Sequence, residues 1–418
     1  NINKFNNENK KGISLIDQHD KYGMWGPYGG NFLPETLIKP VKDLENLFYK
    51  LRNNKKFVNE WNYHLKNFIG TPTSFVKLEN LTKYLGGAQI YAKVVSEAKG
   101  GAHKCYSALT HAMLCKYSNR DTLATDTGAG YNGKTFSIMA KYFGLKLLVF
   151  MGTKDITRQK PNCDAIRKNL GKIIPVSTGG QGLCEAVSEL MRYWVSNCDH
   201  VHVGTGSTVG ANIFIKICGW SVSQISKELK LQILNEFGRI PKKLKLLNCV
   251  GGGSSSFGLW NSFMDYDKEQ VELIGVEAGG PKRSKLHAAP LSHGAKIGVL
   301  HGSRQRVLMD KDGQILPTES IAAGLDYPGV SPLHCLLQDQ KRARYISISD
   351  EEALSAYKLV TKYESHNVSP SLEPAHSFSY AIKIAPKLSK DTILVVNNCG
   401  DSIKDKHIIK KRLGKYTR

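Results

Sequence analysis

Short runs of β-branched and aliphatic residues alternate with longer amphipathic stretches along most of the chain. The apolar runs predict buried strands at residues 89–94, 122–125, 145–151, 172–176, 200–203, 246–250, 273–276 and 393–396. The amphipathic stretches predict helices at residues 108–117, 135–142, 161–170, 183–195, 221–237 and 350–364. Regular alternation of strand and helix predicts an α/β fold, in which a mostly parallel sheet carries helices on its faces.

The length of the chain predicts more than one domain. Its 418 residues exceed what one hydrophobic core usually organises, so we expect two domains with a ligand-binding cleft between them. No apolar run approaches the roughly 20 residues that span a bilayer, and residues 1–11 lack the apolar part of an export signal. The 9 cysteines stand singly with no CxxC pair, which argues against a disulfide framework or a zinc site. We therefore expect a cytoplasmic protein without a membrane partner.

The formal net charge of +22 raises the question of a nucleic-acid partner. Lysines are spread along the chain, and the only dense basic run is the tail at residues 404–418. No zinc finger, aromatic RNA-binding signature or basic heptad array accompanies it. We therefore expect a solvated, lysine-rich surface that binds no nucleic acid. An anionic substrate and cofactor would also suit this charge.

Two glycine-rich stretches, at residues 128–133 and 251–253, follow predicted strands, and the second has the composition of a phosphate-binding turn. Its residues are Gly251, Gly252, Gly253, Ser254 and Ser255. Glycines let backbone N–H groups approach one anion, and serine hydroxyls add donors. The stretch lacks the lysine of a Walker loop and the spacing of a dinucleotide-binding loop. Taken alone, a tight strand-to-helix turn without a ligand explains it equally well.

A lysine follows the glycines of another turn. Lys104 ends the run Lys-Gly-Gly-Ala-His-Lys at residues 99–104, just before a predicted helix. A lysine that forms a Schiff base must approach a carbonyl cofactor closely and be partly desolvated, so that its amine is nucleophilic. Taken alone, a lysine after two glycines is more often a solvated surface residue.

Several motifs in a fixed order resemble one family. They are GGAHK at residues 100–104, DTGAG at 126–130 and GGGS at 251–254, with YGGNFLPETL at 28–37, KDITRQKPN at 154–162, AGLDYPGV at 323–330 and SLEPAH at 371–376. Together they resemble the cofactor and substrate motifs of the tryptophan synthase β-chain family, over roughly residues 20–412.

The resemblance implies a fold-type II pyridoxal-phosphate (PLP) enzyme. Such an enzyme has two open, twisted, mostly parallel sheets flanked by helices, with the active site between domains. Residues 1–70 would form an N-terminal extension and helical lead-in packed on the core. Residues 71–100 and 210–418 would form the larger cofactor domain, and residues 101–209 the smaller, mobile domain.

The resemblance also implies an activity, that of a carbon–oxygen lyase which replaces the hydroxyl of L-serine with indole through an aminoacrylate to give L-tryptophan. Lys104 would bind PLP covalently and abstract the α-proton, with Asp126 as the second catalytic residue. The cofactor would also be held by His103, Gly251, Gly252, Gly253, Ser254, Ser255, Glu373 and Cys399. The substrate would be bound by Thr127, Gly128, Ala129, Gly130, Tyr131 and Asn132.

Domain closure, a cation and protein partners complete these expectations. Arg158 and Asp326 would pair when the mobile domain closes, although a plain structural ion pair explains them equally well. Backbone carbonyls would bind a monovalent cation, Na⁺ or K⁺, and they belong to Gly251, Tyr327 and Gly329. The family forms homodimers. A tryptophan synthase α chain is a further expected partner (α2β2), although the family lysine that pairs with it is Cys184 here.

The chain departs from the family around the expected reaction centre. Asp126 replaces the glutamate that handles the serine hydroxyl and indole, and its carboxylate stands farther back by one methylene, roughly 1.5 Å. Tyr131 and Asn132 replace Gln-His, and Tyr106 replaces an asparagine, so we expect added bulk at the cofactor face. Cys399 replaces the serine that faces the pyridine nitrogen, where we expect a neutral partner. Related serine and threonine dehydratases can carry a cysteine there.

Three hypotheses remain open. The first is that the chain makes L-tryptophan, and the second, which the departures favour, is a PLP-dependent serine deaminase that releases pyruvate and ammonia. A weakened β-chain homologue kept for binding is a variant of this rival. The third is a non-enzymatic, cation-rich binding protein, which the charge alone supports. His301 either lines the indole pocket or is a packed loop histidine.

Overall fold

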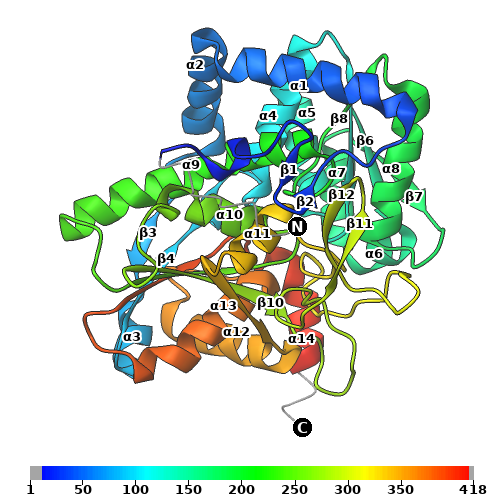
Figure 1. Cartoon of the computed structure of the whole chain (residues 1–418). Coiled ribbons are helices and arrows are strands. Elements are labelled where there is room, and N and C mark those ends of the chain that lie inside the picture. Colours follow the sequence, from blue (N-terminus) through cyan, green and yellow to red (C-terminus); the bar gives the residue numbers. More distant parts are fainter. Residues whose placement is uncertain (1–11, 414–418) are drawn as a thin grey trace.

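The computed structural model describes residues 12–413 and contains three β-sheets packed with helices (Figure 1). The expected strands are present as β4 (Gln89–Lys93), β5 (Thr122–Thr127), β6 (Lys146–Gly152), β7 (Lys172–Val176), β8 (Val201–Val203), β9 (Leu244–Cys249), β10 (Val271–Ala278) and β14 (Ile393–Asn397). The expected helices are present as α4 (Lys104–Tyr117), α5 (Tyr131–Phe143), α7 (Lys160–Lys168), α8 (Leu183–Asn197), α9 (Asn212–Phe237) and α12 (Asp350–Glu364). The predicted α/β class is confirmed.

The largest sheet has the strand order β13-β10-β9-β14-β4-β3, with β13 (Ala343–Ile348) and β3 (Phe75–Lys77) at its edges. Neighbouring strands are parallel except for β3, which runs antiparallel to β4. Its side chains alternate between two hydrophobic cores, since Leu246 lies in one and Leu247 in the other. A sheet that is buried on both faces needs nearly continuous apolar strands. Its strands therefore stand out in the sequence as apolar runs.

The second sheet is fully parallel and has the order β7-β6-β5-β8. Helices α5 and α8 pack against its strands. All of its strands come from residues 122–203, whereas the largest sheet takes its strands from residues 75–93 and 244–397. The division into domains and the mobility of residues 101–209 stay predictions.

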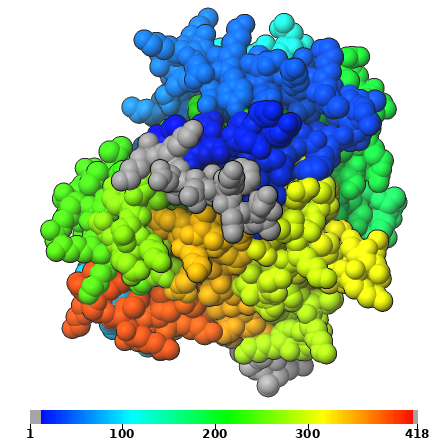
Figure 2. Space-filling view, in the orientation of Figure 1, coloured from blue at the N-terminus to red at the C-terminus, as the bar shows by residue number. Residues whose placement is uncertain are grey.

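A third, antiparallel sheet was not predicted. It joins β1 (Met24–Trp25) and β2 (Tyr28–Gly29) to β12 (Ser303–Val307) and β11 (Lys296–Leu300). Gly29 pairs with Arg304, so the N-terminal segment lies against residues near 300, as the blue and yellow surfaces of Figure 2 show. The two-residue strands and the exposed side chains of β11 leave no apolar periodicity to detect.

The remaining helices complete the layers around these sheets. They are α1 (Ile38–Arg52), α2 (Lys55–His64), α3 (Glu79–Leu85), α6 (Thr153–Arg158), α10 (Ser254–Trp260), α11 (Pro332–Asp339), α13 (Leu372–Ile384) and α14 (Lys406–Leu413). Helices α1 and α2 pack on α9 and α4 at one end of the molecule, where Phe48 and Trp61 meet Trp220 (Figure 1). None of the described helices is long and apolar enough to cross a membrane.

Candidate active site

One cavity lies beyond the carboxyl ends of β5, β9 and β14, where α/β proteins usually bind ligands. It is lined by the expected cofactor residues His103, Lys104, Gly251, Gly252, Gly253, Ser254, Ser255, Glu373 and Cys399. Asp126, Thr127, Gly128, Ala129, Tyr131, Asn132, Tyr327 and His301 also line it. Segments far apart in the sequence therefore meet at one place.

Lys104 is the first residue of α4 and follows two glycines in the left-handed conformation, Gly100 and Gly101 (φ 95° and 79°). Its Nζ donates a hydrogen bond to the carbonyl oxygen of Gly206 at 2.6 Å. Burial lowers the pKa of the Lys104 ammonium, which favours the neutral, nucleophilic amine. A Cβ at residue 206 would lie 1.9 Å from Asn132 Oδ1 and 3.0 Å from Lys104 Cδ, so glycine there leaves room for both side chains.

The turn between β9 and α10 forms a cradle in which a side chain would not fit. A Cβ at Gly252 would lie 2.0 Å from Ser207 Oγ, and Gly253 has a φ of 96°. Ser254 Oγ lies 2.9 Å from His103 Nε2. His103 Nδ1 is buried and has no partner among the described residues. The close backbone and the serine hydroxyls fit the phosphate of a cofactor.

Asp126 lies near the end of β5 and lines the same cavity as Lys104. Burial raises the pKa of its carboxyl to about 6, although the charge of Lys104 opposes this rise. A carboxyl with a pKa near neutrality exists in both protonation states at working pH. It can therefore give a proton to one group and take one from another.

The loop after Asp126 is fixed by Asn132, whose Nδ2 donates to Thr125 Oγ1 at 2.8 Å and to the Asp126 carbonyl at 2.7 Å. Two buried oxygens of this loop, Thr127 Oγ1 and Asn132 Oδ1, have no partner among the described residues. Both residues line the cavity, so these polar atoms remain available to a ligand. Gly130 does not line the cavity, and its left-handed φ of 84° instead turns the chain into α5.

The three substitutions expected to add bulk at the cofactor face have different outcomes. Tyr131 and Asn132 do line the cavity, and Tyr131 Oη donates a hydrogen bond to the Asp401 carbonyl. The prediction for Tyr106 is wrong, because its side chain is fully buried in the hydrophobic core and does not line the cavity. On a helix, a residue two positions after Lys104 points about 200° away from it.

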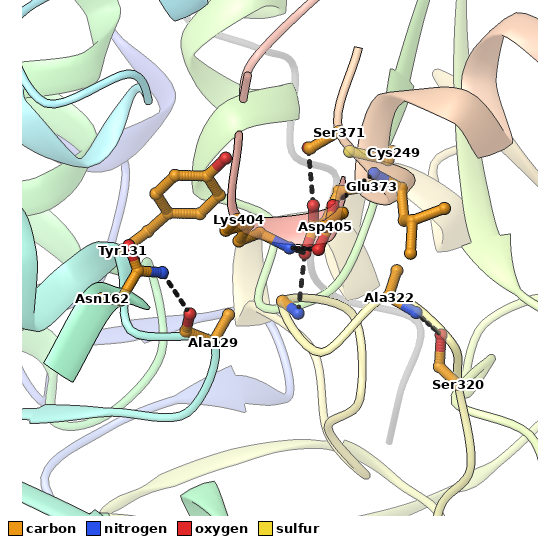
Figure 3. Close-up of polar contacts among 12 residues, drawn as sticks. Ala129, Tyr131, Asn162, Cys249, Ser320, Ala322, Ser371, Glu373, Lys404 and Asp405 are labelled. Atoms are coloured by element: carbon orange, nitrogen blue, oxygen red, sulfur yellow. Dashed lines mark hydrogen bonds and ion pairs between the residues drawn. The ribbon is translucent and has the colours of Figure 1, made fainter. Parts of the chain in front are cut away.

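Glu373, on α13, belongs to a buried charged cluster that the sequence did not reveal (Figure 3). Lys404 Nζ donates to Glu373 Oε1 at 2.9 Å and to Asp405 Oδ1 at 2.6 Å, and it lies 5.2 Å from the ring centroid of Tyr131. The assignment of Lys404 to a solvated basic tail is wrong, since it is 2% exposed. Residues 414–418 of that tail lie outside the described residues.

The cluster fixes the charge of Glu373. Burial alone would raise the pKa of its carboxyl, but the charge of Lys404 and a hydrogen bond from Ser371 Oγ lower it to about 2. The amide N–H of Gly324 also donates to Glu373, at 3.0 Å. Burial works against the Lys404 ammonium too, but Asp405 and Glu373 raise its pKa. Glu373 therefore presents an ionised carboxylate to the cavity.

Replacing Lys404 with methionine is expected to lower the free energy of unfolding by about 3–5 kcal/mol, because two buried carboxylates lose their counter-charge. Urea unfolding at neutral pH measures the change. Lys39→Met is the matched control, since Lys39 pairs with Asp43 on an exposed surface and should change little. An equal effect of both variants would contradict a special role for the buried cluster.

Cys399 lies just beyond β14, and its Sγ is 3.5 Å from Cys249 Sγ at the end of β9. The hydrogen bond from Cys249 lowers the pKa of the Cys399 thiol, against its burial and with help from His103. The neutral partner expected at this position stays a prediction.

Arg158 and Asp326, expected to pair on domain closure, approach to 3.9 Å between Nη2 and Oδ2. Arg158 makes a closer ion pair with Asp155, three residues earlier on α6. The sequence did not predict this pair. Arg158 Nε and Asp326 Oδ1 are buried without a partner among the described residues. The pair is therefore loose in this structure, and its gating role stays a prediction.

His301 lines the cavity, and its place in an indole pocket stays a prediction. Its Nδ1 lies 2.8 Å from Tyr327 Oη and its Nε2 lies 3.1 Å from the Cys184 carbonyl. Burial lowers the pKa of its imidazole to about 4, so it is neutral at working pH. Cys184 thus lies beside the cavity wall, at the start of α8.

The expected cation ligands are backbone carbonyls, which no side-chain cluster can reveal. Gly251 and Tyr327 line the cavity, whereas Gly329 packs against Gln305, where a Cβ would meet Oε1 at 2.5 Å. In the described part of the chain, no group of three or more His, Cys, Asp or Glu side chains could hold a metal ion. The monovalent cation stays a prediction.

Comparison with known proteins places this site in a family. Residues 67–400 match a family of the description "Pyridoxal-phosphate dependent enzyme". The tryptophan synthase beta chain of Bacillus pumilus (strain SAFR-032) is 39% identical over 392 residues, covering 93% of this chain and 96% of the relative. The tryptophan synthase beta chain of Acinetobacter calcoaceticus is 38% identical over 394 residues, covering 94% and 96%.

Solved structures share the fold. A fungal L-serine ammonia-lyase from Rhizomucor miehei superposes with a TM-score of 0.62 at 19% identity, covering 83% of this chain and 99% of that one. A pyridoxal 5'-phosphate-dependent aspartate racemase gives 0.60 at 15% identity, covering 83% and 94%. Identities this low show the fold alone. The family match and the long, nearly full-length relatives together show that the chain belongs to the pyridoxal-phosphate-dependent enzymes, as a homologue of the tryptophan synthase β chains.

Proposed function

We propose that the chain is a tryptophan synthase β-type lyase that replaces the hydroxyl of L-serine with indole to give L-tryptophan. The observation that carries this proposal is that Lys104, Asp126 and the Gly251–Ser255 turn line one cavity. An amine, a carboxyl with a pKa near neutrality and a phosphate cradle are the groups that such a reaction needs. The similarity of the chain to tryptophan synthase beta chains over 93–94% of its length supports the same substrates.

The residues fit PLP, which supplies an electron sink when it is bound. The turn at residues 251–255, with His103, would hold the phosphate. Lys104, whose pKa is lowered by burial, would form the covalent link and carry the α-proton of serine. Glu373 would present its ionised carboxylate to the ring, and Cys399 would face the ring nitrogen.

Asp126 would serve both halves of the reaction. Its protonated form would donate to the departing serine hydroxyl, and its carboxylate would take a proton from indole. The substrate carboxylate would be bound by the loop at residues 127–132. Leu183, Val187 and Met191 give one side of the cavity an apolar wall that suits an aromatic ring.

A serine deaminase is the second candidate function. Asp126 favours it, since its carboxylate is one methylene shorter than the family glutamate and reaches less far toward indole. If indole addition is slower than hydrolysis, the dehydrated substrate is released to water and hydrolysed to pyruvate and ammonia. Both functions share the removal of the serine α-proton.

The shared step has a direct test. The full chain loaded with PLP is incubated with L-serine in D₂O, and loss of the α-proton signal is followed by NMR, with D-serine as the control. L-serine exchange together with tryptophan once indole is added supports the proposal. Absence of exchange in a chain that binds PLP would overturn both candidate functions.

A homodimer is the expected assembly, because the related β chains pair and a two-fold interface is the commonest solution for identical chains. Small-angle scattering of the full chain should give about twice the chain mass of 46.3 kDa. The α chain and the cation are proposed as further partners on the similarity alone. A mass of one chain at micromolar concentration would contradict the dimer.

A further inference from the structure

Cys249 and Cys399 are held side by side by the pairing of β9 with β14. The two strands are parallel neighbours, with Val396 opposite Leu247. Cys249 ends β9, and Cys399 follows the end of β14 by two residues. Their sulfurs lie 3.5 Å apart, and both are free thiols. Neighbouring strands lie about 4.8 Å apart, which is within the Cα separation that a disulfide spans.

The cavity gives small molecules a route to this pair. Cys249 and Cys399 are only 4% and 5% exposed, yet both line the cavity. A protein oxidant is too large to enter, whereas a hydroperoxide is not. The hydrogen bond from Cys249 lowers the pKa of the Cys399 thiol, which favours Cys399 as the attacking sulfur, and Cys249 lies within reach as the resolving thiol.

We propose that Cys249 and Cys399 are a redox pair that forms an intramolecular disulfide when a small hydroperoxide enters the cavity. The Cys399 thiolate attacks one peroxide oxygen, the O–O bond breaks, and hydroxide leaves and takes a proton to become water. The sulfur of Cys249 then attacks the Cys399 sulfenic acid, losing its proton as the second water leaves. Two thiols and one hydrogen peroxide give one disulfide and two waters. The thiols are oxidised and the peroxide is reduced.

The disulfide changes the site that we propose for PLP, so this part rests on the proposed function. It draws the Cys399 sulfur toward Cys249 and away from the ring that it would face. It also links the end of β9, two residues before Gly251 of the cradle, covalently to Cys399. Loss of one hydrogen bond to the cofactor weakens binding by roughly tenfold. Bound PLP, in turn, covers the two sulfurs and slows their oxidation.

The test uses the full chain, with and without PLP, treated with hydrogen peroxide and then alkylated. Peptide mass spectrometry is expected to show a crosslink between the peptides of Cys249 and Cys399, with the loss of two hydrogens and reversal by dithiothreitol. The crosslink should form more slowly in the PLP-loaded chain. PLP should bind the oxidised chain roughly tenfold more weakly by fluorescence titration.

Variants separate this pair from general oxidation. Cys249→Ser should leave a Cys399 sulfenic acid that dimedone traps, and Cys399→Ser should abolish the crosslink. The control Cys198→Ser changes a half-buried cysteine elsewhere and should leave the crosslink intact. Sulfinic acid at Cys399 in the unchanged chain without any crosslink would overturn the proposal. The mass readout needs neither serine nor indole, so a crosslink without tryptophan formation would defeat only the proposed function.

Discussion

Replacing Lys104 with alanine is expected to abolish the covalent attachment of PLP and to lower tryptophan formation by more than about a thousandfold. Lys104 is the only lysine among the described residues that line the cavity. Lys404 lies nearby, but its amine is held by Glu373 and Asp405. No other described amine can therefore take its place.

Borohydride reduction of the PLP-loaded chain, followed by peptide mass spectrometry, measures the attachment. The adduct should map to Lys104 in the unchanged chain and be absent from Lys104→Ala. Lys99→Ala removes an exposed lysine five residues earlier and should keep the adduct. A reducible adduct that persists in Lys104→Ala would show that another residue carries the cofactor.

Removing the carboxyl of Asp126 has the second largest expected effect. Asp126→Asn keeps the size of the side chain but cannot move a proton, so tryptophan formation should fall by about 10²–10⁴-fold. In the unchanged chain, the carboxyl pKa of about 6 sets opposite limits for the two halves of the reaction. Serine dehydration needs the protonated form and should slow above about pH 6. Indole addition needs the carboxylate and should slow below it.

These two pH limits should be lost in Asp126→Asn when each half-reaction is followed separately across the pH range. Their persistence would assign the titration to another group. The thermal unfolding of the variant is the control for its fold. An unchanged tryptophan rate in a well-folded Asp126→Asn would exclude Asp126 as the acid and base.

Lengthening the carboxylate tests its reach. Asp126→Glu adds one methylene and should raise tryptophan formation more than pyruvate release, if the rest of the pocket keeps the family geometry. Tyr131 and Asn132 line the cavity and are the residues that could keep the longer glutamate from its productive position. Steady-state rates of both products in the two proteins decide the question. An unchanged or lower ratio of tryptophan to pyruvate would mean that the pocket is remodelled around the aspartate.

The parallel sheets were predictable because burial on both faces demands continuous apolar runs, as at β9 and β14. The third sheet was not, because β1 and β2 have two residues each and their partners come from residues near 300. Strand pairs that distant leave no local pattern in the sequence.

The site was predictable where the backbone conformation or a close contact requires glycine, as in the turns at residues 100–101 and 251–253. Lys404 could not be predicted, since a lysine is rarely buried without a partner and its partner Glu373 lies 31 residues away. The neighbouring Asp405 was the one feature of the local sequence that indicated a charged partner for Lys404. The error at Tyr106 came from reading sequence distance instead of the helical period.

The central claim is that this cavity joins indole to serine. The most direct measurement incubates the PLP-loaded full chain with L-serine at increasing indole concentrations and follows tryptophan and pyruvate in the same reaction. The account predicts that tryptophan appears and that pyruvate release falls as indole rises, because both products come from one dehydrated substrate. Pyruvate release that is independent of indole, with no tryptophan formed, would contradict the account and identify the chain as a serine deaminase.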